Sequence, residues 1–223
     1  MLLYFMFIIP PMLLAFVAQG MVKYRYAKAL KLPARMTGAA AARLILDSAG
    51  LRHIKIEQTP GKLSDHYSPR EKIIRLSPEV YGGSTLASVG IAAHECGHAI
   101  QHATKYGPLV LTQFAWPMAA FGSNAAFIAI IAGLALNLLG LAYLGLALFG
   151  VVLVYQLVNL PVEFNASTRA KAQLVTLGVV PEQDMPAVRG VLWAAAMTYV
   201  AGMIAVLSQF LYYALIIMNS SRD

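Results

Sequence analysis

Three residues whose types and spacing suit metal chemistry, His94, Glu95 and His98, form the pattern His-Glu-x-x-His. If this segment is helical, His94 and His98 lie one turn apart on the same face, so both imidazoles can reach a single ion. Glu95 is rotated by about 100° from His94 and lies beside the metal rather than on it. This pattern is typical of zinc sites in which a third protein ligand comes from elsewhere and water takes the fourth position. It predicts one Zn²⁺ per chain, with Glu95 as the catalytic general base.

The sequence around the motif predicts the helix that this chemistry requires. Ser84 follows two glycines and is a suitable N-cap, and apolar and small residues recur at helical spacing from Leu86 to Ala99. Gly107-Pro108 is expected to end the helix. A motif that occurred by chance on a surface helix would not need these flanking helix signals, so their presence favours a metal site.

The composition indicates a membrane protein. Of the 223 residues, 59% are hydrophobic and only 12% are charged, and the mean hydropathy is +0.64. The apolar residues cluster in four stretches, residues 2–18, 114–136, 138–160 and 191–218. A helix rises 1.5 Å per residue, so each stretch is long enough to cross a hydrocarbon core of about 30 Å. We therefore expect four transmembrane helices.

The first apolar stretch is expected to be a retained anchor. A cleaved signal peptide normally carries basic residues before its apolar run, whereas here Lys23, Arg25 and Lys28 follow the run. This order favours an anchor with its N-terminus outside the membrane.

The net charge of +7 is unevenly distributed. Basic residues concentrate between the first and second apolar stretches and between the third and fourth, while the turn between the second and third has none. Both basic segments are therefore expected to be cytoplasmic, and their charges to favour anionic membrane lipid. Nothing else in the sequence supports a nucleic-acid partner.

A single cysteine, Cys96, excludes an internal disulfide and is expected to serve packing.

We thus predict a mainly α integral membrane protein with four transmembrane helices and a small cytoplasmic α+β region of zincin-like metallopeptidase type. The predicted parts are an anchor at 1–20, a cytoplasmic region at 21–112, and three membrane helices within 113–223 that are interrupted by a cytoplasmic loop at 161–190.

Thr37 is expected to cap a helix that Gly50 ends. Alternation at residues 53–57 and 72–76 predicts two strands, with a loop at 64–69 between them. This small sheet could offer an edge to an extended peptide, or be a plain hairpin.

Glu163 is the candidate third metal ligand. It stands at the end of the third apolar stretch, where an ionisable group without a partner is costly and is often functional. The competing explanation is a glutamate that merely reaches the membrane interface. His102 lies two turns from His94, about 12 Å along the axis, too far to bind the same ion. Gln101 and Thr104 stand where a metzincin has glycine and histidine.

The segments His94-Glu95-Cys96-Gly97-His98 and Leu160-Pro161-Val162-Glu163-Phe164-Asn165-Ala166-Ser167 together resemble the YugP-like family of membrane-bound neutral zinc metallopeptidases. The resemblance extends over nearly the whole chain and is most specific at these two motifs. It implies a gluzincin arrangement with His94, His98 and Glu163 as ligands and Glu95 as base.

The segment after Glu163 is also similar to the Glu-Phe-x-Ala-Asp signature of HtpX-like membrane peptidases. Ser167 stands where that signature has aspartate, so the orientation of a ligand histidine falls to Ser167, Asn165 or another group. Sequence does not rank the candidates for binding substrate or stabilising an oxyanion, which are His66, Tyr67, Tyr81 and Tyr199.

The expected function is zinc-dependent hydrolysis of peptide bonds in membrane or juxtamembrane proteins, at the cytoplasmic face of a prokaryotic plasma membrane. An intramembrane protease is less consistent, because Gly82-Gly83-Ser84-Thr85 and Lys105 interrupt the apolar residues around His94. Two functions without proteolysis also compete, a non-catalytic zinc-binding membrane protein and a metal transporter. A transporter would place its ligands near the bilayer midplane, and these apolar stretches offer almost no charged residues there. The oligomeric state stays open.

Overall fold

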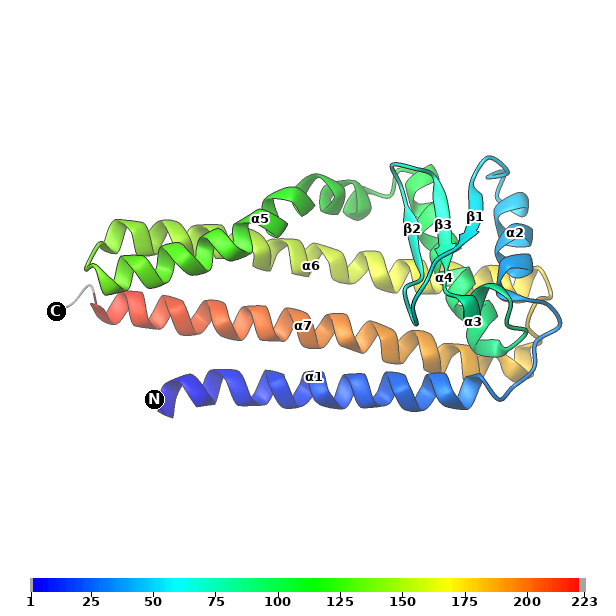
Figure 1. Cartoon of the computed structure of the whole chain (residues 1–223), viewed down its shortest axis with the longest axis horizontal. Coiled ribbons are helices and arrows are strands. Elements are labelled where there is room, and N and C mark those ends of the chain that lie inside the picture. Colours follow the sequence, from blue (N-terminus) through cyan, green and yellow to red (C-terminus); the bar gives the residue numbers. More distant parts are fainter. Residues whose placement is uncertain (1, 221–223) are drawn as a thin grey trace. The chain divides into compact units, whose positions relative to one another are not determined.

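The computed structural model describes residues 2–220 and is mainly helical, with one small sheet (Figure 1). Its elements, in chain order, are α1 (Leu2–Ala29), α2 (Gly38–Ser48), β1 (Lys55–Gln58), β2 (His66–Ser68), β3 (Ile73–Leu76), α3 (Pro78–Tyr81), α4 (Leu86–Ala103), α5 (Gly107–Ala135), α6 (Leu139–Thr176), the short 3₁₀ helix η1 (Glu182–Asp184) and α7 (Met185–Ser220).

The chain divides into two compact units. The first unit contains residues 2–18, 110–161 and 198–220, and the second contains residues 19–109 and 162–197. The long helices α1, α5, α6 and α7 therefore contribute to both units, α5 by its first three residues only. All residues of the predicted zinc motif and its candidate third ligand belong to the second unit.

Within residues 2–220, four helical segments are long and apolar enough to cross a membrane, as the composition predicts. They are Leu2–Ala29, Gly107–Ala135, Leu139–Thr176 and Glu182–Ser220. Each helix extends beyond the apolar stretch seen in the sequence. The clearest case is α6, which continues past Leu160 through Pro161 to Thr176.

The prediction of a loop at residues 161–190 was wrong at both ends, because residues 161–176 belong to α6 and residues 185–190 belong to α7. In this part of α6, every fourth residue is buried: Val162, Ala166, Ala170 and Leu174. This spacing places the four side chains on one face of the helix, where they can pack against the rest of the second unit. Packing of that face outweighs the tendency of Pro161 to end a helix.

The sheet has three strands in the order β1-β3-β2. The central strand β3 pairs parallel with β1 and antiparallel with β2, with Tyr67 opposite Ile74. The prediction of a loop at 64–69 was therefore wrong at His66–Ser68, and the sheet is not a plain two-stranded hairpin. Tyr67 packs against the core of the second unit, so tertiary contacts fix a strand that local composition does not indicate.

The predicted metal-binding helix is α4, but its ends differ from the prediction. The N-cap is Thr85 rather than Ser84, and its hydroxyl oxygen accepts a hydrogen bond from the backbone of Ser88 at 3.2 Å. Gly107-Pro108 does not end α4, which stops at Ala103. Instead it forms the first turn of α5, a position that suits proline.

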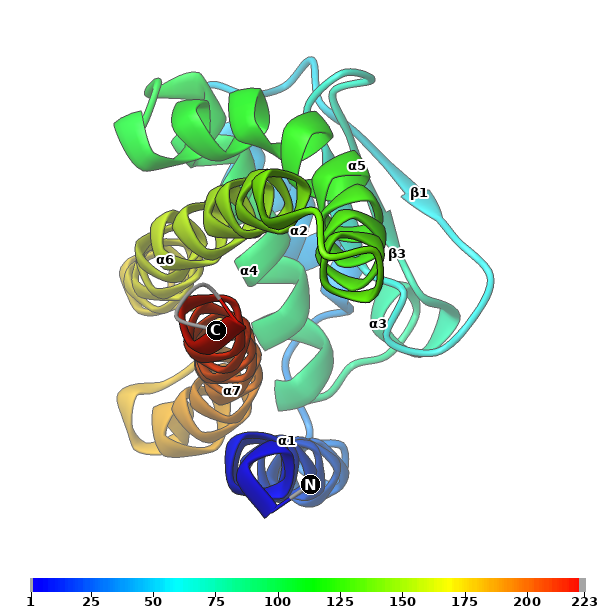
Figure 2. The ribbon, with the colours of Figure 1, turned by 90° about the vertical axis from the view of Figure 1, so that its left-hand side faces the viewer.

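Several further predictions agree with the structure. Thr37 caps α2 by accepting a hydrogen bond from Ala40, and Gly50 has a φ of 74°, the left-handed conformation typical of a helix stop. α2 and α4 pack against each other within the second unit (Figure 2). Cys96 is buried in this contact, where its thiol lies 3.6 Å from the carbonyl oxygen of Ala42.

A glycine of the motif sets how closely α4 approaches α6. A Cβ atom added at Gly97 would lie only 2.4 Å from the carbonyl oxygen of Ala166. Any side chain here would push the two backbones apart. The close contact explains how the helix that carries Glu163 comes within reach of the two histidines.

Candidate metal centre

Three ligand atoms converge where α4 meets α6. The Nε2 atoms of His94 and His98 are 3.2 Å apart, and Glu163 Oε2 lies 3.3 Å from the first and 3.6 Å from the second. The two histidines come from consecutive turns of α4, as the spacing predicts, and Glu163 comes from α6. These are the only residues within the described part of the chain that form such a cluster of metal-binding side chains.

The distances fit a tetrahedral zinc ion. Ligand atoms that lie about 2.0–2.1 Å from a tetrahedral centre are about 3.3 Å from one another, close to the three separations observed. Glu163 Oε2 is buried and has no hydrogen-bond partner within residues 2–220, which is costly unless a cation satisfies it. Two imidazoles and one carboxylate are also a donor set that zinc accepts in catalytic sites. The residues present therefore fit the metal.

Gln101 orients His98 by a hydrogen bond whose direction can be deduced. The Gln101 side-chain nitrogen donates to the Val162 carbonyl oxygen at 2.8 Å, and that oxygen can only accept. The amide oxygen of Gln101 must then face His98 Nδ1, 3.1 Å away, and accept a proton from it. In the neutral ring the lone pair is therefore on Nε2, the atom that faces Glu163 and His94.

Ser167 has the corresponding position beside the other histidine. Its hydroxyl oxygen lies 3.2 Å from His94 Nδ1, and the residue is 6% exposed. When His94 Nε2 acts as a ligand atom, Nδ1 carries the proton and donates to this hydroxyl. Each candidate ligand histidine thus has its own partner at Nδ1.

Glu95 lies next to the cluster and is 7% exposed. No hydrogen bond to another residue among 2–220 holds its carboxylate, so the group can interact with water or substrate. Burial raises the pKa of Glu95, and the nearby histidines oppose this rise. A raised pKa suits a group that must both accept and release a proton near neutral pH.

The electrostatics of His98 show how strongly this cluster attracts positive charge. Burial opposes protonation of the ring, but the Glu163 carboxylate, 3.6 Å from Nε2, and the charge of Glu95 raise the pKa of His98 to about 9. A proton and a metal ion compete for the same nitrogen atoms, so zinc binding here displaces a proton.

The remaining candidates are distributed around the second unit. Asn165 lies beside the centre, since its side-chain oxygen accepts hydrogen bonds from Gln101 at 3.1 Å and from Arg169 at 2.8 Å. Tyr67 is half-buried, and its hydroxyl lies 2.8 Å from Nδ1 of His102, one turn beyond His98 on α4.

The other three candidates are His66, Tyr81 and Tyr199. His66 is exposed, and its Nδ1 contacts the backbone oxygen of Ser64 at 2.8 Å. Tyr81, on α3, packs against the hydrophobic core. Tyr199 lies on the part of α7 that belongs to the first unit.

Two residues that the sequence pattern does not assign to the centre are important in the structure. In the sequence, Gln101 serves only as evidence against a metzincin, although it lies three residues after His98 and therefore beside it on the helix. Gly97 stands out only as part of the motif. Its role depends on the approach of α6, which no local pattern in α4 reveals.

Comparison with known proteins identifies the class. Residues 4–218 match the protein family described as "Putative neutral zinc metallopeptidase", and the chain belongs to this family. The chain is also 42% identical over 212 residues to "Putative membrane protease YugP" of Bacillus subtilis (strain 168), and the match covers 94% of each chain. No solved structure matches the chain. The resemblance inferred from the two motifs is confirmed, and the membrane relative and the four apolar helices together support a multi-pass membrane protein.

Proposed function

We propose that this protein is a zinc-dependent endopeptidase of the gluzincin type, with His94, His98 and Glu163 as ligands and Glu95 as general base. The observation that carries this proposal is the convergence of the three ligand atoms within 3.2–3.6 Å of one another, directly beside a buried glutamate. The family match supports the same class of chemistry.

In the proposed reaction the chain supplies orientation and proton transfer. Zinc, when bound, lowers the pKa of a coordinated water towards 7 and polarises the scissile carbonyl. Glu95 accepts a proton from the attacking water and delivers it to the leaving amine. Gln101 and Ser167 hold the two imidazoles in the tautomer that leaves Nε2 free to bind metal.

The proposed substrates are membrane proteins or segments close to a membrane. Glu163 directly follows an uncharged run, residues 139–162 of α6, which is one of the four candidate membrane spans. A metal centre at the end of such a run would lie near the membrane surface. The positions of the basic residues favour the cytoplasmic side.

The test compares the wild-type protein with Glu95→Gln, using zinc content and cleavage of fluorescein-labelled casein as readouts. Removal of a general base should lower cleavage by about 10²–10⁴-fold while one zinc per chain is retained. Glu182→Gln is the matched control, because Glu182 is an exposed glutamate that pairs with Arg189 at 2.7 Å. Unchanged cleavage in Glu95→Gln would remove Glu95 from the role of base.

A second experiment tests the substrate class separately. One unstructured peptide is offered either free or joined to a single transmembrane helix, with the protease in the same liposomes. We expect faster cleavage of the anchored form. Equal rates would refute the preference for membrane substrates and leave the peptidase assignment intact.

A further inference from the structure

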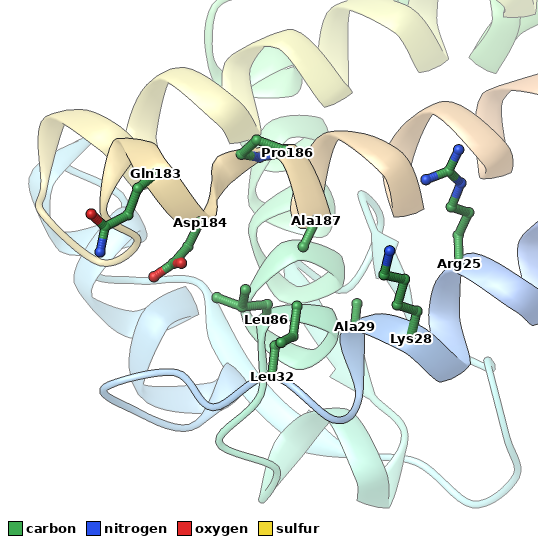
Figure 3. Close-up of a pocket in the computed structure, with 9 residues that line it drawn as sticks. All are labelled: Arg25, Lys28, Ala29, Leu32, Leu86, Gln183, Asp184, Pro186 and Ala187. Carbon is green, nitrogen blue, oxygen red and sulfur yellow. The ribbon is translucent and has the colours of Figure 1, made fainter.

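A cavity of about 280 Å³ lies in the second unit, between the basic end of α1 and the start of α7 (Figure 3). Arg25 and Lys28 of α1 lie at one end of it, and Gln183 and Asp184 lie at the other. Its apolar wall includes Leu86. No member of the metal centre lines this cavity, so it requires its own explanation.

The two cations that face the cavity are not neutralised by the described part of the chain. Neither Arg25 nor Lys28 forms a salt bridge with any residue in that range. Arg189, which follows Asp184 by five residues, instead pairs with Glu182. The Arg25 side chain lies against α7, since its Cδ would be in van der Waals contact, at 3.4 Å, with a Cβ added at Gly190.

The position along α1 indicates which anion is available. No charged residue occurs from Leu2 to Val22, and Lys23, Arg25 and Lys28 then follow. A helix of this kind leaves the hydrocarbon region at its basic end, at the depth of the lipid headgroups. The phosphate of a phospholipid is therefore the most abundant anion that these side chains would meet.

Asp184 narrows the choice of headgroup. A carboxylate in the wall repels a ligand that carries only negative charge, but it attracts an ammonium group. Figure 3 shows Arg25 and Lys28 at the opposite end of the cavity from Asp184, and this order of charges suits a ligand with a phosphate at one end and a cation at the other. An ammonium group can donate hydrogen bonds to Asp184, whereas the quaternary nitrogen of choline cannot.

We propose that this cavity binds the phosphoethanolamine headgroup of a membrane phospholipid, with the phosphate at Arg25 and Lys28 and the ammonium at Asp184. The site is separate from the metal centre and does not depend on the proposed peptidase activity. A lipid bound at this site would contact both the end of α1 and the start of α7.

Native mass spectrometry of the full-length, delipidated protein measures the binding directly. Short-chain phosphatidylethanolamine should bind the wild type with one site per chain, and more tightly than phosphatidylcholine or phosphatidylglycerol. Arg25→Gln with Lys28→Gln should weaken this binding about tenfold or more. The control pair, Lys23→Gln with Lys31→Gln, removes the same charge from the same segment but does not alter the wall of the cavity, so binding should stay unchanged.

The control is informative because phosphatidylethanolamine has no net charge at neutral pH. Diffuse attraction by a basic surface acts on net charge and would not distinguish the two pairs of substitutions. Equal loss of binding in both pairs, or no loss in either, would overturn the proposal.

Two further measurements test the contact between Asp184 and the ammonium group, and whether the ligand is a lipid or a soluble phosphate compound. Asp184→Asn should abolish the preference for phosphatidylethanolamine over phosphatidylglycerol, and a preference that persists would overturn the role of Asp184. Soluble phosphoethanolamine and inorganic phosphate should bind at least tenfold more weakly than the lipid. Binding as tight as that of the lipid would instead make this a site for a soluble phosphate ester.

Discussion

The α4–α6 and α5–α6 helix pairs both approach closely at a glycine, and the surroundings of the two contacts differ. In the second unit, α4 meets α6 at Gly97, where a Cβ would lie 2.4 Å from the carbonyl oxygen of Ala166. In the first unit, α5 and α6 lie side by side, and a Cβ at Gly133 would lie 2.4 Å from the backbone nitrogen of Ala142 (Figures 1 and 2). Both contacts exist because glycine lets two backbones come together.

The residues around the two contacts distinguish a candidate chemical site at Gly97 from a structural contact at Gly133. Gln101, Glu163 and Ser167 are buried beside Gly97. The α5–α6 contact belongs to an apolar cluster that includes Ile130 and Ala142. Among residues 2–220, every buried polar or charged residue except Thr112 belongs to the second unit. A close backbone contact at glycine therefore packs helices in one unit and brings the candidate metal ligands together in the other.

The largest effect should follow from Glu163→Ala. This change removes the only carboxylate of the candidate ligand set and the buried oxygen that has no hydrogen-bond partner among residues 2–220. We expect zinc affinity to fall by about 100-fold or more, beyond the 10–100-fold typical of losing a group that only orients a ligand. Elemental analysis and chelator competition measure this directly.

The control for this change is Glu79→Ala, which removes an exposed glutamate of the same unit that pairs with Lys62. Its zinc content should match that of the wild type. If Glu163→Ala retained one tightly bound zinc per chain, the third ligand would have to be another residue.

Gly97→Ala and Gly133→Ala compare the two contacts with the same chemical change. Each adds one methyl group where the backbone of the neighbouring helix lies 2.4 Å away, so each should destabilise its helix pair by about 1–3 kcal/mol. Only Gly97→Ala should also weaken zinc binding, because it displaces α6 and with it Glu163.

Thermal unfolding and zinc titration of the two variants separate stability from metal binding. Equal loss of zinc in both variants would mean that the metal centre responds to global stability and not to the α4–α6 distance. No loss of zinc in Gly97→Ala would mean that the centre tolerates movement of α6.

The sequence predicts the parts of this protein that depend on local periodicity and charge. The spacing of His94 and His98 places them one turn apart, and both lie on one face of α4 as expected. The absence of charge in residues 139–162 makes Glu163 stand out as functional. Long apolar runs likewise predict the four candidate spans.

Features that depend on contacts between distant segments were not predicted. β2 is only three residues long, and its pairing with β3 is not visible in its composition. The continuation of α6 beyond Leu160 was not predicted, because it depends on packing of the face formed by Val162, Ala166, Ala170 and Leu174. The role of Gln101 depends on the carbonyl oxygen of Val162, a residue of another helix.

A smaller effect is expected for Gln101→Met, which keeps the volume of the side chain but removes its hydrogen bonds. His98 Nδ1 and the Val162 carbonyl oxygen would both lose a buried partner. We expect a 10–100-fold loss of zinc affinity, typical of groups that orient a ligand. Gln173→Met, on α6 in the same unit, should have no effect on zinc. Identical affinities for the two variants would show that Gln101 does not orient His98.

The smallest effect is expected at Ser167, the counterpart of Gln101 beside His94. Its hydroxyl makes one neutral hydrogen bond to His94 at 3.2 Å, worth about 1 kcal/mol, so Ser167→Ala should weaken zinc binding about fivefold. Ser167→Asp should bind zinc more tightly than Ser167→Ala, because a carboxylate accepts a stronger hydrogen bond and makes the imidazole a better donor to the metal.

The same aspartate would add a carboxylate one helical turn from the buried Glu163, whose charge already interacts with that of Glu95. Repulsion among buried like charges should therefore lower the thermal stability of the zinc-free Ser167→Asp protein, and zinc should restore it. Chelator competition and unfolding with and without zinc test both effects. Weaker zinc binding by Ser167→Asp than by Ser167→Ala would show that charge repulsion outweighs orientation at His94, and that a neutral hydroxyl is the better partner in this centre.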